Sequence, residues 1–156
     1  MDYKGYCLWA DDIPNPEAPH YIVITSSANP DDMVMVVAIS SIKYKTDGTE
    51  KYHDKACLLS VGDIVDDKGR PIITKPSFIR YEYAIDMRTK DILSKQFGDK
   101  YRYKCKISEE LLKRIQDGAK ISEDLEPRFQ KYFDFFSSFQ QSFSVLRCRK
   151  QYSVGW

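Results

Sequence analysis

The chain has 156 residues, of which 42% are hydrophobic and 13% aromatic, enough apolar material for the core of one globular domain. Lysine and arginine number 24 against 23 aspartate and glutamate residues, which leaves a formal net charge of +1. This balance excludes a protein that binds nucleic acid through its overall positive charge alone, although it is compatible with a local basic patch.

The four cysteines, Cys7, Cys57, Cys105 and Cys148, lie far apart and form neither a C-x-x-C pair nor a cluster with zinc-ligand spacing. We therefore expect reduced thiols, with no metal and no cofactor. No stretch near the first residues is typical of a signal peptide, and no stretch is long enough to span a membrane. A cytoplasmic protein without a membrane partner is the simplest expectation.

Short apolar segments separated by turn-forming residues predict strands over most of the first part of the chain. Residues 21–24 and 33–39 are rich in β-branched side chains and flank a turn, as expected for a hairpin. Residues 77–85 alternate, which predicts a strand with Tyr81 on a buried face and Arg80 on a solvated face. Strands are also predicted at residues 6–10 and 56–59. Many short strands favour a compact barrel.

Helical signals begin at residue 108. Ser108 is a good N-cap, and Gly118 suits the end of a helix over residues 108–118. A second helix is predicted from Pro127, and it carries an aromatic stripe at helical spacing, made of Phe129, Tyr132, Phe133, Phe136, Phe139 and Phe143. The stripe is expected to pack against the rest of the protein, with a dimer or antitoxin surface as the alternative.

These signals divide the chain into three parts: residues 1–126 with the barrel and the first helix, residues 127–143 with the aromatic-rich helix, and residues 144–156 as a basic tail. The tail contains Arg147, Arg149 and Lys150 and no acidic residue. We expect a solvated end, with phosphate binding as the alternative. The fold class predicted is mostly β with C-terminal α.

The order of the elements resembles the MazF/PemK/Kid family of toxins. The stretches K-G-Y-C-L-W-A-D-D-I-P, H-Y-I-V-I-T-S and V-M-V-V-A-I-S-S follow one another as in the opening of that family. Gly5, Trp9, Asp11 and Pro14 match its first strand and turn, and Ser26 closes the second strand. The likeness covers roughly residues 4–118. It implies a small SH3-like β-barrel, here followed by two helices.

The resemblance also implies an activity. The family cleaves single-stranded RNA without a metal, acts as a dimer and is held inactive by an antitoxin. Its catalytic arginine falls on His20 of this chain and its catalytic hydroxyl on Ser40. The proline that follows the arginine in the family is Tyr21 here, and the G-x-E-Q stretch that usually precedes the arginine is missing from residues 14–19.

The residue types fit metal-free RNA cleavage, which needs a base for the 2′-OH, donors for the phosphate and an acid for the leaving oxygen. His20 can be base or acid near neutral pH. Ser40 is expected to donate to a phosphoryl oxygen, and Arg80 to stabilise the developing charge. His53 is a candidate acid if its loop folds over the groove. The predicted RNA contacts are Tyr21, Ser41, Tyr81 and Tyr83, with the tyrosines stacking on bases.

Each of these residues also has a structural interpretation. Both histidines can be ordinary structural or solvated residues, Ser40 can bond to the local backbone, and Arg80 can pair with Glu82. The tyrosines can belong to the core. The alternative function is a non-catalytic barrel that binds nucleic acid or a protein, as CcdB-type barrels bind gyrase. A third hypothesis is a phage-encoded or defence-associated relative with another target.

Overall fold

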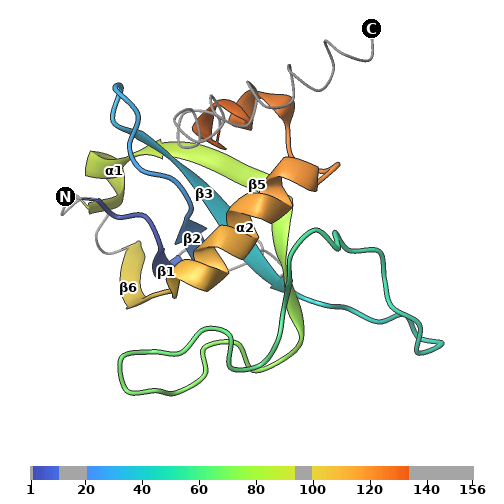
Figure 1. The fold of residues 1–156 in the computed structure, drawn as a ribbon. Coiled ribbons are helices and arrows are strands. Elements are labelled where there is room, and N and C mark those ends of the chain that lie inside the picture. Colours follow the sequence, from blue (N-terminus) through green and yellow to red (C-terminus); the bar gives the residue numbers. More distant parts are fainter. Residues whose placement is uncertain (1, 11–20, 94–99, 134–156) are drawn as a thin grey trace, which may run out of the picture.

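The computed structural model describes residues 2–10, 21–93 and 100–133 (Figure 1). It consists of one antiparallel sheet, two α-helices and a short 3-10 helix. The elements in chain order are β1 (Tyr6–Ala10), β2 (Tyr21–Ile24), β3 (Met33–Ser41), β4 (Leu58–Leu59), β5 (Ser77–Arg88), α1 (Thr89–Leu93), β6 (Tyr101–Lys106), α2 (Glu109–Ile121) and η1 (Pro127–Phe129).

The six strands are ordered β4-β5-β3-β2-β1-β6, and the sheet curls into a half-barrel (Figure 1). The predicted mostly β fold is therefore confirmed, and so is the β2–β3 hairpin, in which Tyr21 pairs with Ile39 and Ile24 with Val36. The strand β6 and the helix α1 were not predicted. The second helix predicted from Pro127 begins as η1, and residues 134–156, with the rest of the aromatic stripe and the basic tail, lie outside the described residues.

Both faces of the sheet are covered, and β3 accordingly reads as a continuous apolar run. On one face, Met35, Val37 and Ile39 of β3 join the main core, against which α2 packs. On the other face, Val34 and Val36 form a smaller cluster with Ile92 of α1. Cys7, Cys57 and Cys105 are buried free thiols, as expected, while Cys148 lies outside the described residues.

The helix α2 begins as predicted but ends later. The Ser108 side chain accepts a hydrogen bond from the main-chain N–H of Leu111, and the helix continues past Gly118 to Ile121. Gly118 is therefore not a helix stop. A Cβ on this residue would collide with the hydroxyl of Tyr81 and would lie 2.9 Å from the carbonyl oxygen of Ala56. Glycine is needed because the helix passes this close to its neighbours.

A wide bulge in β5 changes the predicted alternation. Val36 and Ala38 are two residues apart on β3, but their partners on β5, Ile85 and Arg80, are five residues apart. Tyr81 is only 1% exposed and packs in the core, as predicted, whereas Tyr83 is 46% exposed. Tyr83 therefore does not share the buried face with Tyr81, because the bulge breaks the two-residue repeat between them.

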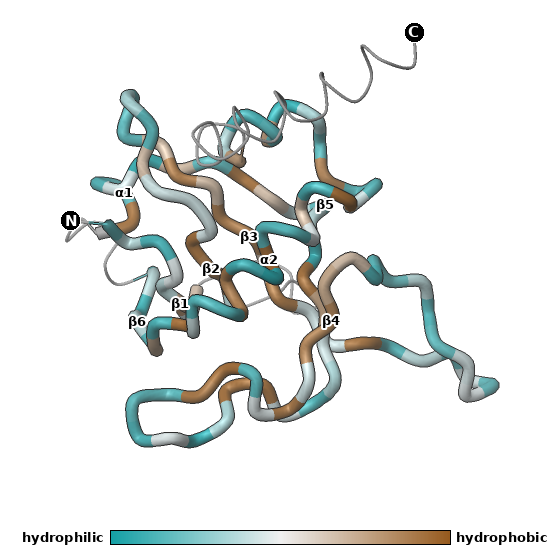
Figure 2. Tube along the Cα trace, in the orientation of Figure 1, coloured by the Kyte–Doolittle hydropathy of each residue, from teal (hydrophilic) through white to brown (hydrophobic). Residues whose placement is uncertain are grey.

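Two long arms connect β3 to β4 and β4 to β5 (Figure 1). Each doubles back through an isolated bridge, Tyr44 with Glu50 in the first and Val65 with Pro71 in the second. Figure 2 shows hydrophilic residues at both tips. The returning half of the first arm, residues 51–56, brings His53 and Asp54 back to the body of the protein, where both are buried.

Candidate functional site

The first predicted catalytic residue, His20, lies outside the described residues. Its chain neighbour Tyr21 opens β2 and pairs with Ile39, the residue next to Ser40. The remaining candidates on β3, β5 and the first arm can be compared directly.

Ser40 and Arg80 lie on the same face of the β3–β5 pair. Ser40 pairs with Phe78, and Ala38 pairs with Arg80. Directly paired residues of an antiparallel sheet project to the same face, and residues two apart on one strand share that face. Phe78, Arg80 and Ser40 therefore form one neighbourhood near the β5 bulge. Ser40 is half-buried, and the side chain of Arg80 is 29% exposed.

The guanidinium of Arg80 is held by its neighbours on β5. Its Nε donates to a carboxylate oxygen of Glu82 at 2.5 Å, and its central carbon lies 4.1 Å from the centre of the Tyr83 ring. The pairing with Glu82, the structural alternative weighed for this residue, is thus present. The arginine is fixed beside an exposed aromatic ring, an arrangement that can offer a cation and a stacking surface together.

His53 packs against the same neighbourhood. Its ring lies 5.3 Å from that of Phe78, so the returning half of the first arm does fold over β5. The ring nitrogen Nδ1 is 3.2 Å from the carbonyl oxygen of Lys51. A carbonyl only accepts, so Nδ1 carries a proton, and Nε2 accepts or donates according to the charge of the ring. Nε2 lies 3.9 Å from a carboxylate oxygen of Glu50.

His53 also borders a cleft between the first arm and the end of α2. The cleft has a volume of about 530 Å³ and is lined by the arm residues 50–56 together with Ile121 and Glu123. The side chain of His53 is only 4% exposed, whereas Tyr52 and Ile121 at the rim are 82% and 72% exposed. The imidazole is thus at the floor of the cleft, with little contact with solvent.

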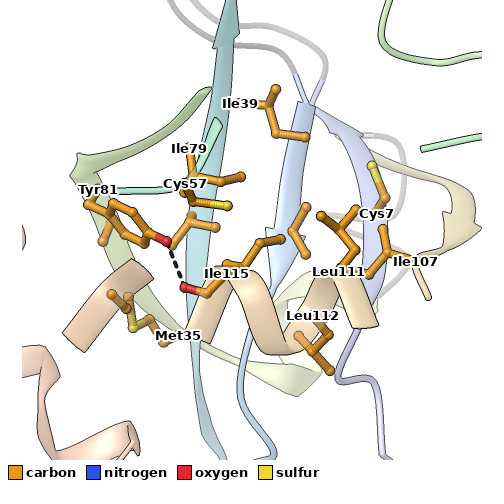
Figure 3. Packing of buried hydrophobic residues seen from close by; sticks show 14 of the residues in the cluster. Cys7, Met35, Ile39, Cys57, Ile79, Tyr81, Ile107, Leu111, Leu112 and Ile115 are labelled. Atoms are coloured by element: carbon orange, nitrogen blue, oxygen red, sulfur yellow. Dashed lines mark hydrogen bonds between the residues drawn. The ribbon is translucent and has the colours of Figure 1, made fainter. Parts of the chain in front are cut away.

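The other predicted RNA-binding residues do not gather at this site. Tyr81 is a core residue whose hydroxyl donates to the carbonyl of Ile115, so its ring is not accessible to a base (Figure 3). Ser41 pairs with Ser77, and so lies on the face opposite Ser40. Tyr21 also lies on that opposite face, with its ring 4.7 Å from that of Trp9. Of the four, Tyr83 alone joins Arg80.

The strand β6 was not predicted, although its sequence YRYKCK alternates aromatic and basic residues over its first four positions. Tyr103 on this strand is 49% exposed. The interleaving of aromatic and basic residues is the signal that would have marked this strand as a candidate nucleic-acid contact.

Within residues 2–10, 21–93 and 100–133, no group of three or more His, Cys, Asp or Glu side chains has the arrangement of a metal site. The same residues contain no helix with the length and apolar character needed to cross a bilayer. Compared with protein-family models, curated proteins and solved structures, the chain gives no significant match.

Proposed function

We propose that this protein is a toxin-like endoribonuclease that cleaves single-stranded RNA without a metal, at the surface around Ser40 and Arg80. The observation that carries the proposal is the common face of these two residues on β3 and β5. They come from strands more than thirty residues apart in sequence, and the resemblance to the MazF/PemK/Kid family independently assigns the hydroxyl role to Ser40. The location proposed for this activity is the cytoplasm, in a toxin–antitoxin or phage-defence setting.

In the proposed reaction the 2′-oxygen attacks the adjacent phosphorus while a base takes its proton. The bond from phosphorus to the 5′-oxygen breaks, and an acid returns a proton to that oxygen, which leaves a cyclic phosphate and a free 5′-hydroxyl. Ser40 donates a hydrogen bond to a phosphoryl oxygen, and Arg80 stabilises the negative charge. Tyr83 stacks on a base beside the scissile phosphate.

The histidines are assigned to the proton transfers. His20, on which the catalytic arginine of the resembled family falls, acts as the base. His53 acts as the acid through Nε2, because its Nδ1 proton is held by the carbonyl of Lys51. The near-complete burial of His53 makes it the first member of the set to test. Replacement by glutamine, which keeps a polar side chain, is the appropriate variant.

The experiment is to incubate purified protein with structured and unstructured RNA in EDTA and to map the new ends. Wild-type protein should cut unstructured RNA, and His20→Ala and Ser40→Ala should each lower the rate by about 100-fold or more. In cells, induction of the wild-type protein should arrest growth, and His20→Ala should not. Cleavage that disappears in EDTA would contradict the proposed chemistry.

A non-catalytic barrel that binds nucleic acid or a protein is the second candidate. It is favoured by the 4% exposure of the His53 side chain and by the 2.5 Å ion pair that holds Arg80. Such a protein would yield no RNA fragments at any enzyme concentration, and its binding would be unaffected by His20→Ala. For either function we propose a homodimer and an antitoxin partner, to be examined by light scattering and by co-purification with a neighbouring small gene product.

A further inference from the structure

The strand β6 forms one edge of the sheet, beside β1 (Figure 1). Three of its six residues, Arg102, Lys104 and Lys106, are basic, and none is acidic. Lys100 precedes the strand, and Lys4 lies in the chain just before β1. A protein with almost no net charge thus concentrates positive charge along one edge.

One exposed and two half-buried aromatic rings accompany these charges. The ring of Tyr103 lies 5.2 Å from that of Tyr6 at an interplanar angle of 64°, and Tyr6 lies 5.4 Å from Tyr3 at 82°. Edge-to-face contacts of this kind fix the rings relative to one another. Tyr103, the most exposed ring of the three, is held by Tyr6 and needs little further ordering to stack on a base.

A bulge in the β1–β6 pair determines which side chains of β6 share a face of the sheet. Cys7 pairs with Cys105, but the next residue, Leu8, pairs with Tyr103, so Lys104 is an extra residue on the β6 side. Tyr103 and Lys106 pair with Leu8 and Tyr6, which share a face of β1 because they are two residues apart. The exposed ring and one of the cations therefore point to the same side of the sheet.

That side is also the side of the proposed cleavage site. Tyr103 pairs with Leu8, Leu8 with Ile22, Ile22 with Ala38 and Ala38 with Arg80, so one row of paired residues crosses the sheet. Four strand spacings give a separation of at most about 19 Å between its ends. Leu8 and Ala38, in the middle of the row, are buried, so contact with a ligand is confined to the two ends.

Acidic residues from two segments lie near this edge: Asp2 near the start of the chain, and Asp66 and Asp67 in the second arm, which both act to raise the pKa of Cys105 on β6. Asp2 accepts hydrogen bonds from Ser27 and from the main-chain N–H of Lys4, and Lys4 and Lys106 both help to lower the pKa of its carboxyl. Asp67, in the second arm, adds to the effect of burial in raising the pKa of Tyr103. Asp67 is therefore near enough to oppose the binding of an anion at Tyr103, and its removal gives a test of opposite sign.

We infer that the β6 edge, with Tyr103 as a stacking platform and Lys106 as a phosphate contact on the same side, binds single-stranded RNA at a distance from the scissile bond. This inference rests on the proposed function, because it extends the substrate of that site by several nucleotides. Stacking together with basic side chains is the arrangement that holds unpaired nucleic acid without base-specific contacts.

The test is the binding of a short fluorescein-labelled single-stranded RNA, followed by fluorescence anisotropy at several salt concentrations. All variants are made in a Ser40→Ala parent, so that the probe stays intact. Tyr103→Ala should weaken binding by about tenfold or more, and Tyr103→Phe should retain it. Replacing Lys106 by alanine should lower the salt slope by about 0.7, the change expected for one lost phosphate contact. Asp67→Asn should strengthen binding.

Matched controls come from other surfaces. Tyr44→Ala removes a tyrosine that is 55% exposed in the first arm, and Lys113→Ala with Lys120→Ala removes two cations from α2. The inference is overturned if the parent does not bind the RNA, or if the Tyr103 and Tyr44 variants bind equally. If Tyr103→Ala does not fold, as judged by circular dichroism, the Lys106 and Asp67 variants decide the question.

The two proposals fail in different ways. RNA that is bound at β6 but never cut would refute the nuclease and leave the inference standing. RNA that is cut by the wild-type protein, while the Tyr103 and Lys106 variants bind it as the parent does, would refute the inference and leave the nuclease standing.

Discussion

The hydroxyl of Tyr81 donates a hydrogen bond of 2.6 Å to the main-chain carbonyl of Ile115 and so joins β5 to α2 (Figure 3). The ring is 1% exposed, and Ile115 is fully buried. Burial, together with the nearby Cys57 and Asp54, raises the pKa of Tyr81 far above its ordinary value, so the hydroxyl stays protonated. Tyr81→Phe should therefore lower the free energy of unfolding by about 1 kcal/mol, measured by urea denaturation.

Gly118 provides a sharper test of the same contact. In an exposed helix, Gly→Ala stabilises by about 1 kcal/mol. Here the new methyl group would meet the Tyr81 hydroxyl and the Ala56 carbonyl, so Gly118→Ala should instead destabilise the protein by about 1–3 kcal/mol. Lys113→Ala compared with Lys113→Gly, at an exposed position of α2, is the control for helix propensity. A Gly118→Ala protein more stable than wild type would contradict the packing described.

Asp86 should make the attachment of the segment after α2 dependent on pH. Its carboxylate accepts a hydrogen bond from Tyr132 at 3.0 Å and pairs with Arg128 at 3.3 Å. Burial acts to raise the pKa of Asp86, but these two partners outweigh it and lower the pKa below the ordinary value of 3.8. A lowered pKa in the folded state gives stability that is present above the unfolded value and is lost as the pH falls.

Asp86→Asn should therefore be less stable than wild type at neutral pH, and the difference should shrink in acid below about pH 4. Unfolding curves at several pH values measure this. Glu123→Gln is a suitable control, since Glu123 is an exposed carboxylate just after α2. If wild type and Asp86→Asn differed in unfolding free energy by the same amount at every pH, the ion pair and hydrogen bond of Asp86 would not be the cause of the lost stability.

The buried thiols should react slowly in the folded protein. The hydrogen bond with Cys105 and burial together raise the pKa of Cys7 well above its ordinary value, and burial raises that of Cys57. Both residues therefore remain thiols at neutral pH, and thiolates are the reactive form. In a Cys148→Ser variant, Ellman's reagent should label the native protein slowly and the urea-unfolded protein rapidly. Rapid labelling of native Cys7 or Cys57 would contradict their burial.

Local patterns were sufficient to predict the elements whose signals are strong. The β-branched runs of β2 and β3 and the N-cap Ser108 with its following leucines were recognised correctly. The edge strand β6 was missed because its YRYKCK sequence has few β-branched residues and is stabilised by pairing with β1, about a hundred residues away. Edge strands often carry such charges, which weakens their strand signal.

The site was harder to predict because a strand pattern does not reveal a bulge. Simple alternation placed Tyr81 and Tyr83 together, but the bulge in β5 separates them into a core residue and a surface residue. In the same way, a glycine such as Gly118 is typical of a helix end. Its place inside α2 is explained only by the close approach of Tyr81 and Ala56. Both features depend on contacts distant in sequence.

The charge beside Arg80 should control how well the protein holds RNA. Glu82 occupies the Nε donor of Arg80 and adds a negative charge at the proposed phosphate site. Glu82→Gln should therefore strengthen RNA binding. The slope of the binding constant against salt concentration should stay as in wild type, because no phosphate contact is removed. Arg80→Ala should weaken binding and cleavage together. Anisotropy and gel assays on the same preparations measure the two effects, and unchanged binding in both variants would place the phosphate elsewhere.

The most direct test of the nuclease is a comparison of two adjacent serines. Ser40 lies on the face of Arg80, and Ser41 lies on the opposite face beside Ser77. Fragments of single-stranded RNA are measured in EDTA for wild type, Ser40→Ala and Ser41→Ala. We predict that Ser40→Ala lowers the rate by about 100-fold or more, while Ser41→Ala stays close to wild type. Equal rates for Ser40→Ala and wild type, or no fragments from any of the three, would contradict the account.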